Sequence, residues 1–293
     1  NDVVMTVTAT DKAGNTSNVF TQKLYIDNTI PEIGVSFDKN NQNTEGLPVQ
    51  EYYQDSRTMT VVYKERNLGF DVDESFTLDD VAKENIWFDI GLENGQQYEY
   101  SLAEIDAGFD GEDLIDVEFV KDTQQGKGRG SYTNDRTVTF KLTFKGQNKY
   151  KVTPHCKDEM DNETAGDSQQ FVVDTEAPKI TDITYTSFNK ETQQYEPIDP
   201  SKPQNTTIRM AVTIKEHYFM LDDSKDDLVE GQIALALEAA DTKAGDNTDY
   251  QAKYEKEAYR KENWSTVVSQ TAEDEWQITF EFNNDANYTM NLT

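Results

Sequence analysis

Apolar and polar residues alternate along much of this chain in runs of about six to ten residues. The clearest runs lie at 3–9, 58–63, 86–92, 138–144, 150–154, 207–214 and 276–282. Alternation with a period of two is typical of a β-strand that buries one face. Polar turns rich in Asp, Asn and Gly separate the runs. The pattern therefore predicts an all-β fold of antiparallel strands.

The chain also repeats itself. Residues 3–31 align with residues 150–178 without a gap, so that Asp11, Asn15 and Asp27 fall on Asp158, Asn162 and Asp174. A third copy begins near the end, where residues 276–290 align with residues 138–152. Repetition at a fixed period indicates a tandem array of one structural unit. The period is about 138 to 147 residues.

The central parts of the copies match more loosely but in the same order. The run 58–67 (TMTVVYKERN) aligns with 207–219 (TIRMAVTIKEHYF), which places Glu65 on Glu216. The repeat is long for a sandwich domain, and the excess lies in two polar insertions, at about 93–134 and 240–270. Tyr250, Tyr254 and Ala258 have a four-residue spacing that suggests a short helix in the second insertion.

These alignments predict three parts. Residues 1–26 would be the last two strands of a preceding domain, residues 27–173 a complete domain, and residues 174–293 a domain that lacks its last strand. The chain is then expected to be a piece of a longer protein. Each junction is a short Pro-containing linker directly after an Asp, which permits little free swing. About seven short strands per part, with polar turns, indicate tandem antiparallel β-sandwiches with polar insertions.

The residues at these turns and junctions carry a resemblance. The segments VTATDKAGNTS, DNTIP and DTEAP, KERN and KEHYF, and WQITFEFNNDANYTMNL resemble the bacterial immunoglobulin-like repeats found in tandem in very large surface proteins of Gram-positive bacteria. The long insertions and Cys156, which stands where the first copy has Ala9, depart from that pattern. The resemblance implies an extracellular location on the bacterial cell surface, as a stalk, adhesin or filament module. It does not imply an enzyme.

Composition and charge exclude several classes of function. The chain has 27 Lys and Arg against 56 Asp and Glu, a formal charge of −29 that would repel nucleic acid. No apolar stretch approaches the length of a transmembrane helix, and a single cysteine excludes a disulfide framework. The low apolar content, 35%, makes disorder an alternative, but aromatic residues at 11% favour a folded chain with modest cores.

Acidic residues at the ends of the predicted strands are candidates for a cation site. In a sandwich of this type, the loop between the last two strands lies beside the incoming linker, so Asp27, Glu65, Asp158 and Asn162 are expected to converge. Asp174 and Glu216 would form the equivalent corner of the next domain. Oxygen ligands of this kind suit structural Ca²⁺ at the domain junctions. The alternative is a plain turn in which Asp and Asn bond the local backbone. No other cofactor is expected.

Three further residue types need an interpretation. Trp87 alternates with the inward Ile86 and Phe88, so it points out of the sheet, where it could stack on a glycan or lie under a folded insertion. Cys156 follows the inward alternation and is interpreted as core. His155 and His217 lie in different domains and are not paired with a nucleophile at a meaningful spacing, so no catalytic residue is assigned.

The leading hypothesis is a structural module of an extracellular bacterial surface protein, with neighbouring repeats of the same chain as its partners. The alternative is a module that binds a glycan or a host ligand through the insertions; self-association is also considered, whereas nucleic acid and membrane insertion are not expected. An exposed aromatic platform in an insertion would favour binding. Insertions packed back on the sandwich would favour the stalk.

Overall fold

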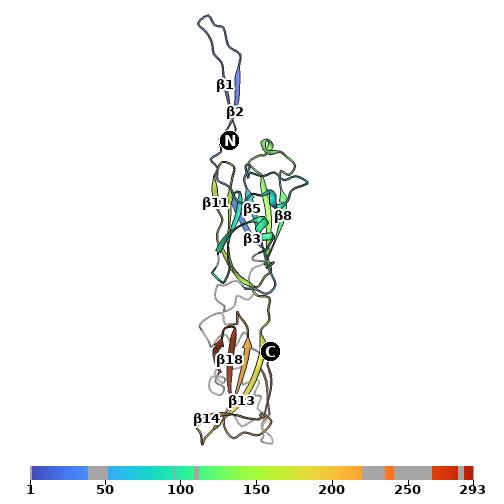
Figure 1. The fold of residues 1–293 in the computed structure, drawn as a ribbon, viewed down its shortest axis with the longest axis vertical. Helices are drawn as coiled ribbons and strands as arrows, with labels where there is room; N and C mark the ends of the chain where they lie inside the picture. Colours follow the sequence, from blue (N-terminus) through green and yellow to red (C-terminus); the bar gives the residue numbers. More distant parts are fainter. Residues whose placement is uncertain are drawn as a thin grey trace. The chain divides into compact units, whose positions relative to one another are not determined.

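A computed structural model describes residues 2–38, 52–95, 97–108, 112–219, 235–240, 266–282 and 287–292. Strands dominate these residues, and the longest helix among them, α1 (Leu102–Asp106), has a single turn (Figure 1). The all-β prediction is confirmed. The chain divides into two compact units with a boundary between Thr175 and Glu176, and residues 1–26 belong to the first unit. The division into three parts stays a prediction.

The first unit contains a sandwich of two sheets. One sheet has the order β4-β12-β10-β6-β7, with β11 also pairing with β10; the other has the order β3-β5-β9-β8. All pairs are antiparallel except β4 with β12. The strands of the first sheet are β4 (Tyr52–Tyr53), β6 (Ile86–Gly91), β7 (Gln97–Ser101), β10 (Asn148–Lys157), β11 (Glu163–Ala165) and β12 (Gln169–Val173). Those of the second are β3 (Glu32–Phe37), β5 (Arg57–Lys64), β8 (Ile115–Asp122) and β9 (Thr137–Phe144).

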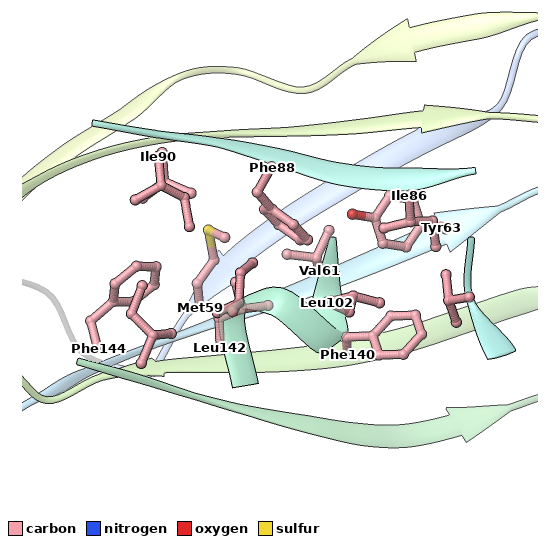
Figure 2. Close-up of a cluster of buried hydrophobic side chains, with 14 of the residues drawn as sticks. Met59, Val61, Tyr63, Ile86, Phe88, Ile90, Leu102, Phe140, Leu142 and Phe144 are labelled. Atoms are coloured by element: carbon pink, nitrogen blue, oxygen red, sulfur yellow. The ribbon is translucent and has the colours of Figure 1, made fainter. Parts of the chain in front are cut away.

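The inward faces of these strands form one core. Every second residue of β5, β6 and β9 is fully buried between the sheets, as the alternation predicts (Figure 2). Burial of a large apolar side chain stabilises a fold by about 1.5–3 kcal/mol, so these strands supply most of the sandwich's stability. Cys156 is also fully buried in this core, as predicted. The labelled core residues are Met59, Val61, Tyr63, Ile86, Phe88, Ile90, Leu102, Phe140, Leu142 and Phe144.

The first insertion folds back on the sandwich. Its strand β7 extends one sheet by pairing with β6, and β8 extends the other by pairing with β9. Helix α1 between them begins at a capping box formed by Ser101 and Glu104 and buries Leu102 and Ile105. The segment predicted as a polar insertion therefore contributes apolar side chains to the core.

The second unit repeats the strand pairing of the first. Its larger sheet has the order β14-β13-β15-β18-β17, and a two-stranded sheet joins β16 to β19. In β15 and β18, Ile208 pairs with Phe282 as Arg57 pairs with Phe144 in β5 and β9. The strands are β13 (Lys179–Asn189), β14 (Gln194–Pro197), β15 (Ile208–Lys215), β16 (Leu235–Ala240), β17 (Thr266–Ala272), β18 (Glu275–Phe282) and β19 (Asn287–Leu292). The helix predicted around Tyr250, Tyr254 and Ala258 lies outside the described residues.

A hairpin in the first unit begins the chain. It consists of β1 (Asp2–Val7) and β2 (Phe20–Tyr25), joined by a long turn. In this hairpin Val3 pairs with Leu24, and in the sandwich Tyr150 pairs with Phe171. The two hairpins therefore have the register that the gapless alignment predicts.

Candidate cation site

Three carboxylates meet where the linker joins the sandwich. Asp27 lies in the linker after β2, Glu65 directly after β5, and Asp158 directly after β10. One oxygen of each carboxylate lies within 4.8 Å of those of the other two. Glu65 is 6% exposed and Asp158 is 2% exposed, whereas Asp27 is half-buried. We call these three residues the carboxylate corner; the sequence predicted that they would converge.

A tight turn holds Asp158 in place. Its Oδ1 accepts hydrogen bonds from the backbone N–H groups of Met160 (2.8 Å) and Asn162 (2.9 Å), and its Oδ2 accepts one from Asn162 Nδ2 (2.8 Å). Asp161 in this turn has a φ of 61°, a left-handed conformation that Asp tolerates better than most residues. The carboxylate is thus fixed by its own turn.

The hairpin has the same turn at Asp11–Asn15. Asp11 Oδ1 accepts from the N–H groups of Ala13 and Asn15, both at 2.9 Å, and its Oδ2 accepts from Asn15 Nδ2 at 2.8 Å. Gly14 has the left-handed conformation that Asp161 has in the sandwich. The hydrogen bonds from Asn15 lower the pKa of Asp11. Because this turn is exposed and still has the same geometry, the local sequence alone accounts for the turn.

Two amides attach the linker to the sandwich. Asn67 Nδ2 donates to Asp27 Oδ2 at 2.5 Å, and Asn162 Nδ2 donates to the carbonyl oxygen of Asp27 at 3.4 Å. Thr29 N–H donates to Asp27 Oδ1 at 3.1 Å. Burial opposes the ionisation of Asp27, but the hydrogen bonds from Thr29 and Asn67 outweigh it and lower its pKa. Asn162, one of the predicted site residues, therefore bridges the turn and the linker.

Glu65 is in an unfavourable electrostatic position. Burial raises its pKa even though Oε1 accepts a hydrogen bond from Asn67 N–H at 2.8 Å. The negative charges of Asp27 and Asp158 raise that pKa further. A cation or a proton at this corner would relieve the repulsion.

The donor atoms match the chemistry of a hard cation. Carboxylate oxygens from three separate segments converge, and the carbonyl of Asp27 belongs to the same corner. Ca²⁺ takes six to eight oxygen ligands of this kind, some of them water. Without a cation, the same contacts describe a linker attached by amides to a turn, the second interpretation that the sequence left open.

The predicted equivalent corner is described in part. Glu216 directly follows β15, is 7% exposed, and accepts a hydrogen bond from Tyr218 N–H at 3.1 Å, as Glu65 does from Asn67. Asp174 follows β12 and belongs to the first unit, whereas Glu216 belongs to the second. Their convergence stays a prediction.

Trp87 points outward from β6, as predicted, and is half-buried. Its ring stacks on that of His155 from β10, with centroids 4.9 Å apart and an interplanar angle of 8°. His155 Nε2 in turn lies 3.1 Å from Asp89 Oδ2. His217 has a similar partner, with Nδ1 at 2.5 Å from Asp274 Oδ1. One face of the Trp87 ring is thus covered, and its use as a glycan platform stays a prediction.

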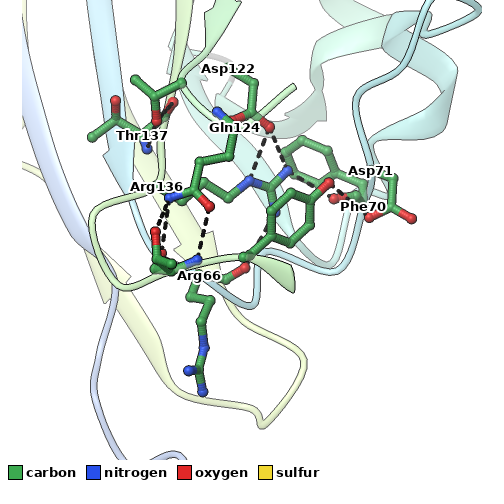
Figure 3. A network of polar contacts seen from close by, with 10 residues as sticks. Arg66, Phe70, Asp71, Asp122, Gln124, Arg136 and Thr137 are labelled. Atoms are coloured by element: carbon green, nitrogen blue, oxygen red, sulfur yellow. Dashed lines mark hydrogen bonds and ion pairs between the residues drawn. The ribbon is translucent and has the colours of Figure 1, made fainter. Parts of the chain in front are cut away.

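Sequence reasoning missed a buried ion pair close to the carboxylate corner. Arg136 is 1% exposed, and its Nε and Nη2 donate to Asp122 Oδ2 at 3.0 and 2.8 Å (Figure 3). Nη2 also donates to the carbonyl of Phe70 at 3.0 Å, and Nη1 to that of Arg66 at 3.3 Å. The pair therefore holds the loop that carries Asn67. In a chain with 83 charged residues, the sequence around Arg136 contains no signal that separates it from a solvated charge.

No protein-family model matches the chain, and no curated protein matches it in sequence. None of the described helices has the length and apolar character needed to cross a membrane.

Proposed function

We propose that the chain is a structural module of an extracellular bacterial surface protein, made of tandem immunoglobulin-like sandwiches that project or link other parts of that protein. The observation that carries this proposal is the parallel pairing of β4 with β12 at one edge of the sheet β4-β12-β10-β6-β7. Tyr52 and Tyr53 pair in parallel with Val172 and Val173, and Asp174 N–H donates to the carbonyl of Tyr53 at 2.9 Å.

Parallel pairing at this position suits a segment that bears tension. A pull along the chain acts first on β3, which precedes β4 and pairs with β5. Once β3 has left β5, the pull draws the amino end of β4 and the carboxyl end of β12 in opposite directions. Because these two ends lie at opposite ends of a parallel pair, the hydrogen bonds between the strands are loaded in shear and must break together. The burial of Leu102 and Ile105 also favours a stalk over binding through this insertion, since these side chains are used for packing.

Single-molecule force spectroscopy on the full chain tests the mechanical role. We expect the sandwich to unfold in one event with a distinct force peak. The 147 residues from 27 to 173 should then release about 500 Å of chain, at roughly 3.5 Å per residue. Gradual lengthening without a force peak would contradict the proposal.

We further propose that Ca²⁺ binds the carboxylate corner and stiffens the junction. At 4.8 Å, the upper limit of their separation, two carboxylates repel each other by about 1 kcal/mol in water and about 3.5 kcal/mol at an effective dielectric constant of 20. A divalent ion offsets this repulsion for all three pairs at once. A ligand that binds only the folded state stabilises that state by about 2.7 kcal/mol when its free concentration is 100 times its dissociation constant.

Thermal unfolding of the full chain in millimolar CaCl₂ and in chelator tests this site. We expect a higher melting temperature with Ca²⁺, and we expect Asp27→Asn or Glu65→Gln to abolish the difference. Glu118→Gln is the matched control, because Glu118 is an exposed carboxylate of β8 whose ion-pair partner, Lys141, lies within β9 away from the corner. Equal melting temperatures in the two buffers would mean that no cation binds the corner. The hydrogen bonds from the side-chain amides of Asn67 and Asn162 would then alone attach the linker to the sandwich.

A further inference from the structure

The apolar residues of the β1–β2 hairpin gather on one face. Val3 pairs with Leu24, Met5 with Gln22, and Val7 with Phe20, so these side chains share a face on which Ile26 continues the alternation. The exposed fractions on this face are 42% for Val3, 42% for Met5, 48% for Val7, 55% for Phe20, 41% for Leu24 and 58% for Ile26. By the strand register, Val4, Thr6, Thr21, Lys23 and Tyr25 fall on the opposite face.

The sandwich contains the same hairpin with that face covered. With the offset of 147 residues, Val3, Met5, Leu24 and Ile26 correspond to Tyr150, Val152, Phe171 and Val173, which are at most 1% exposed. Four of the six residue pairs between β1 and β2 recur between β10 and β12, and the bridge between Thr10 and Thr16 corresponds to the pairing of Lys157 with Glu163.

The residues that cover the inward face of β10 and β12 in the sandwich indicate what kind of partner would cover the apolar face of the β1–β2 hairpin. Phe144 of β9 contacts both Tyr150 and Phe171, with ring centroids 5.0 and 4.9 Å apart, and Phe37 of β3 contacts Phe171 at 5.9 Å. The second edge of β10 pairs with β6. The partner is thus a facing sheet of the β3-β5-β9-β8 type together with an edge strand of the β6 type.

The turn of the hairpin supplies a second, independent match. In the sandwich, the turn Asp158–Asn162 contacts the linker through the Asn162 amide, and Asp158 lies against Glu65 and Asp27. In the hairpin, the turn Asp11–Asn15 has the same internal hydrogen bonds and is exposed. The apolar face and the turn of the hairpin would therefore both fit the same kind of partner.

Charge favours the same assignment. Residues 1–26 contain two acidic and two basic residues and have no net charge, in a chain whose total is −29. A neutral hairpin can dock on an acidic sandwich without the repulsion that two acidic surfaces would have.

We propose that the β1–β2 hairpin is a docking element for the body of a sandwich of this same repeat type, one without its own terminal hairpin. Val3, Met5, Val7, Leu24 and Ile26 would enter the core of that body, because their counterparts in the sandwich are buried. Phe20 would lie at its edge, because its counterpart, Asp167, is exposed. The turn Asp11–Asn15 would contact its linker. This goes beyond the proposed stalk function and does not depend on whether the carboxylate corner binds a cation.

A hairpin exchange within the full chain tests the fit directly. Residues 149–173 are replaced by a second copy of residues 2–26, which has the same length of 25 residues. The readout is the hydrogen exchange of backbone amides in β5 and β9, which lie in the facing sheet and are left unchanged. We expect these amides to stay protected, with a lower melting temperature because Val and Leu replace Tyr150 and Phe171.

Matched variants of the exchanged hairpin separate docking from general damage. Val3→Tyr with Leu24→Phe should raise the melting temperature of the exchanged chain. Met5→Asp on the inward face should increase the exchange rates in β5 and β9 at least 100-fold, whereas Val4→Asp on the outward face should leave them unchanged.

The proposal would be overturned if neither the plain nor the aromatic-restored exchange protected β5 and β9, or if Met5→Asp and Val4→Asp had equal effects. Unprotected exchange variants, together with a dimer of the parent chain that Met5→Asp dissolves, would assign the face to a second copy of the chain and would also overturn it.

Discussion

At the scale of single residues, Glu65 combines burial with two negative neighbours. Its pKa is raised in the folded protein, chiefly by burial, so the folded state binds the Glu65 proton more tightly than the unfolded chain does. Ionisation of this group on raising the pH therefore costs folded-state stability. The loss begins near the usual value of 4.5 and is complete above the raised pKa.

We expect the Glu65→Gln variant, in chelator, to gain stability relative to the parent chain as the pH rises above about 4.5. Urea denaturation from pH 2 to pH 8 measures this difference. Asp27→Asn is the control, and its effect on stability should have the opposite sign. The pKa of Asp27 is lowered, so its ionised form stabilises the folded state above the usual value of 3.8, and this contribution is lost as the pH falls. Parallel pH profiles for the parent and Glu65→Gln would contradict the prediction.

Arg136 and Asp122 form the other residue-scale feature. We expect Arg136→Met to destabilise the sandwich by about 3–5 kcal/mol, because it leaves a buried carboxylate without its partner. Chemical denaturation measures the loss, and Arg136→Met combined with Asp122→Leu should recover most of it. The control is Lys145→Met at an exposed pair with Asp113 and Asp116, where a much smaller change is expected because solvent screens the charges. Equal losses at the two sites would show that burial is not the cause.

At the scale of elements, one turn occurs in two environments. The turn Asp158–Asn162 contacts the linker, and the turn Asp11–Asn15 has the same internal bonds while exposed. The same local sequence therefore builds the turn in both places, and tertiary contacts decide what it binds.

We expect Asn162→Ala to destabilise the sandwich by about 1–2 kcal/mol, because it removes the amide that donates to Asp158 and to the Asp27 carbonyl. It should also increase the hydrogen-exchange and proteolysis rates of the linker at 27–31. Asn15→Ala removes the equivalent bond within the hairpin turn and is the matched control, with an unchanged sandwich. An unaltered linker in Asn162→Ala would show that this amide does not hold it.

At the scale of the whole molecule, the formal charge of −29 opposes compaction through self-repulsion. Added salt shortens the range of this repulsion, from about 30 Å at 0.01 M to about 10 Å at 0.1 M. The charge makes stability depend on ionic strength in addition to any specific ion.

We expect the melting temperature of the full chain to rise as NaCl is increased from 10 to 500 mM. At constant ionic strength, replacing part of the NaCl with CaCl₂ should raise it further, and Glu65→Gln should remove this second increase alone. Differential scanning calorimetry separates the two effects. A response to Ca²⁺ that Glu65→Gln leaves intact would mean that the ion acts on the overall charge and not at the carboxylate corner.

Much of the architecture follows from the sequence by itself. The period-two alternation identified β5, β6, β9 and β10 and the face that each buries, because a strand cannot bury one face without this period. The gapless alignment gave the same register for the hairpin β1–β2 as for β10 and β12, and the ends of the strands indicated that Asp27, Glu65 and Asp158 would converge. These features are local, or they follow from the simple geometry of a sandwich.

Other features were decided by the tertiary structure alone. The sequence of the insertion at about 93–134 is mostly polar, yet two of its apolar residues, Leu102 and Ile105, are buried in the core. The sequence does not distinguish Arg136 from a surface charge, but in the fold it contacts Asp122 and two backbone carbonyls. Likewise, the alternation only indicates that Trp87 points outward, and the structure shows that His155 stacks on its ring. In each case the deciding partner is distant in the chain. A one-dimensional pattern records which face a residue points to, but not which residue from another strand meets it there.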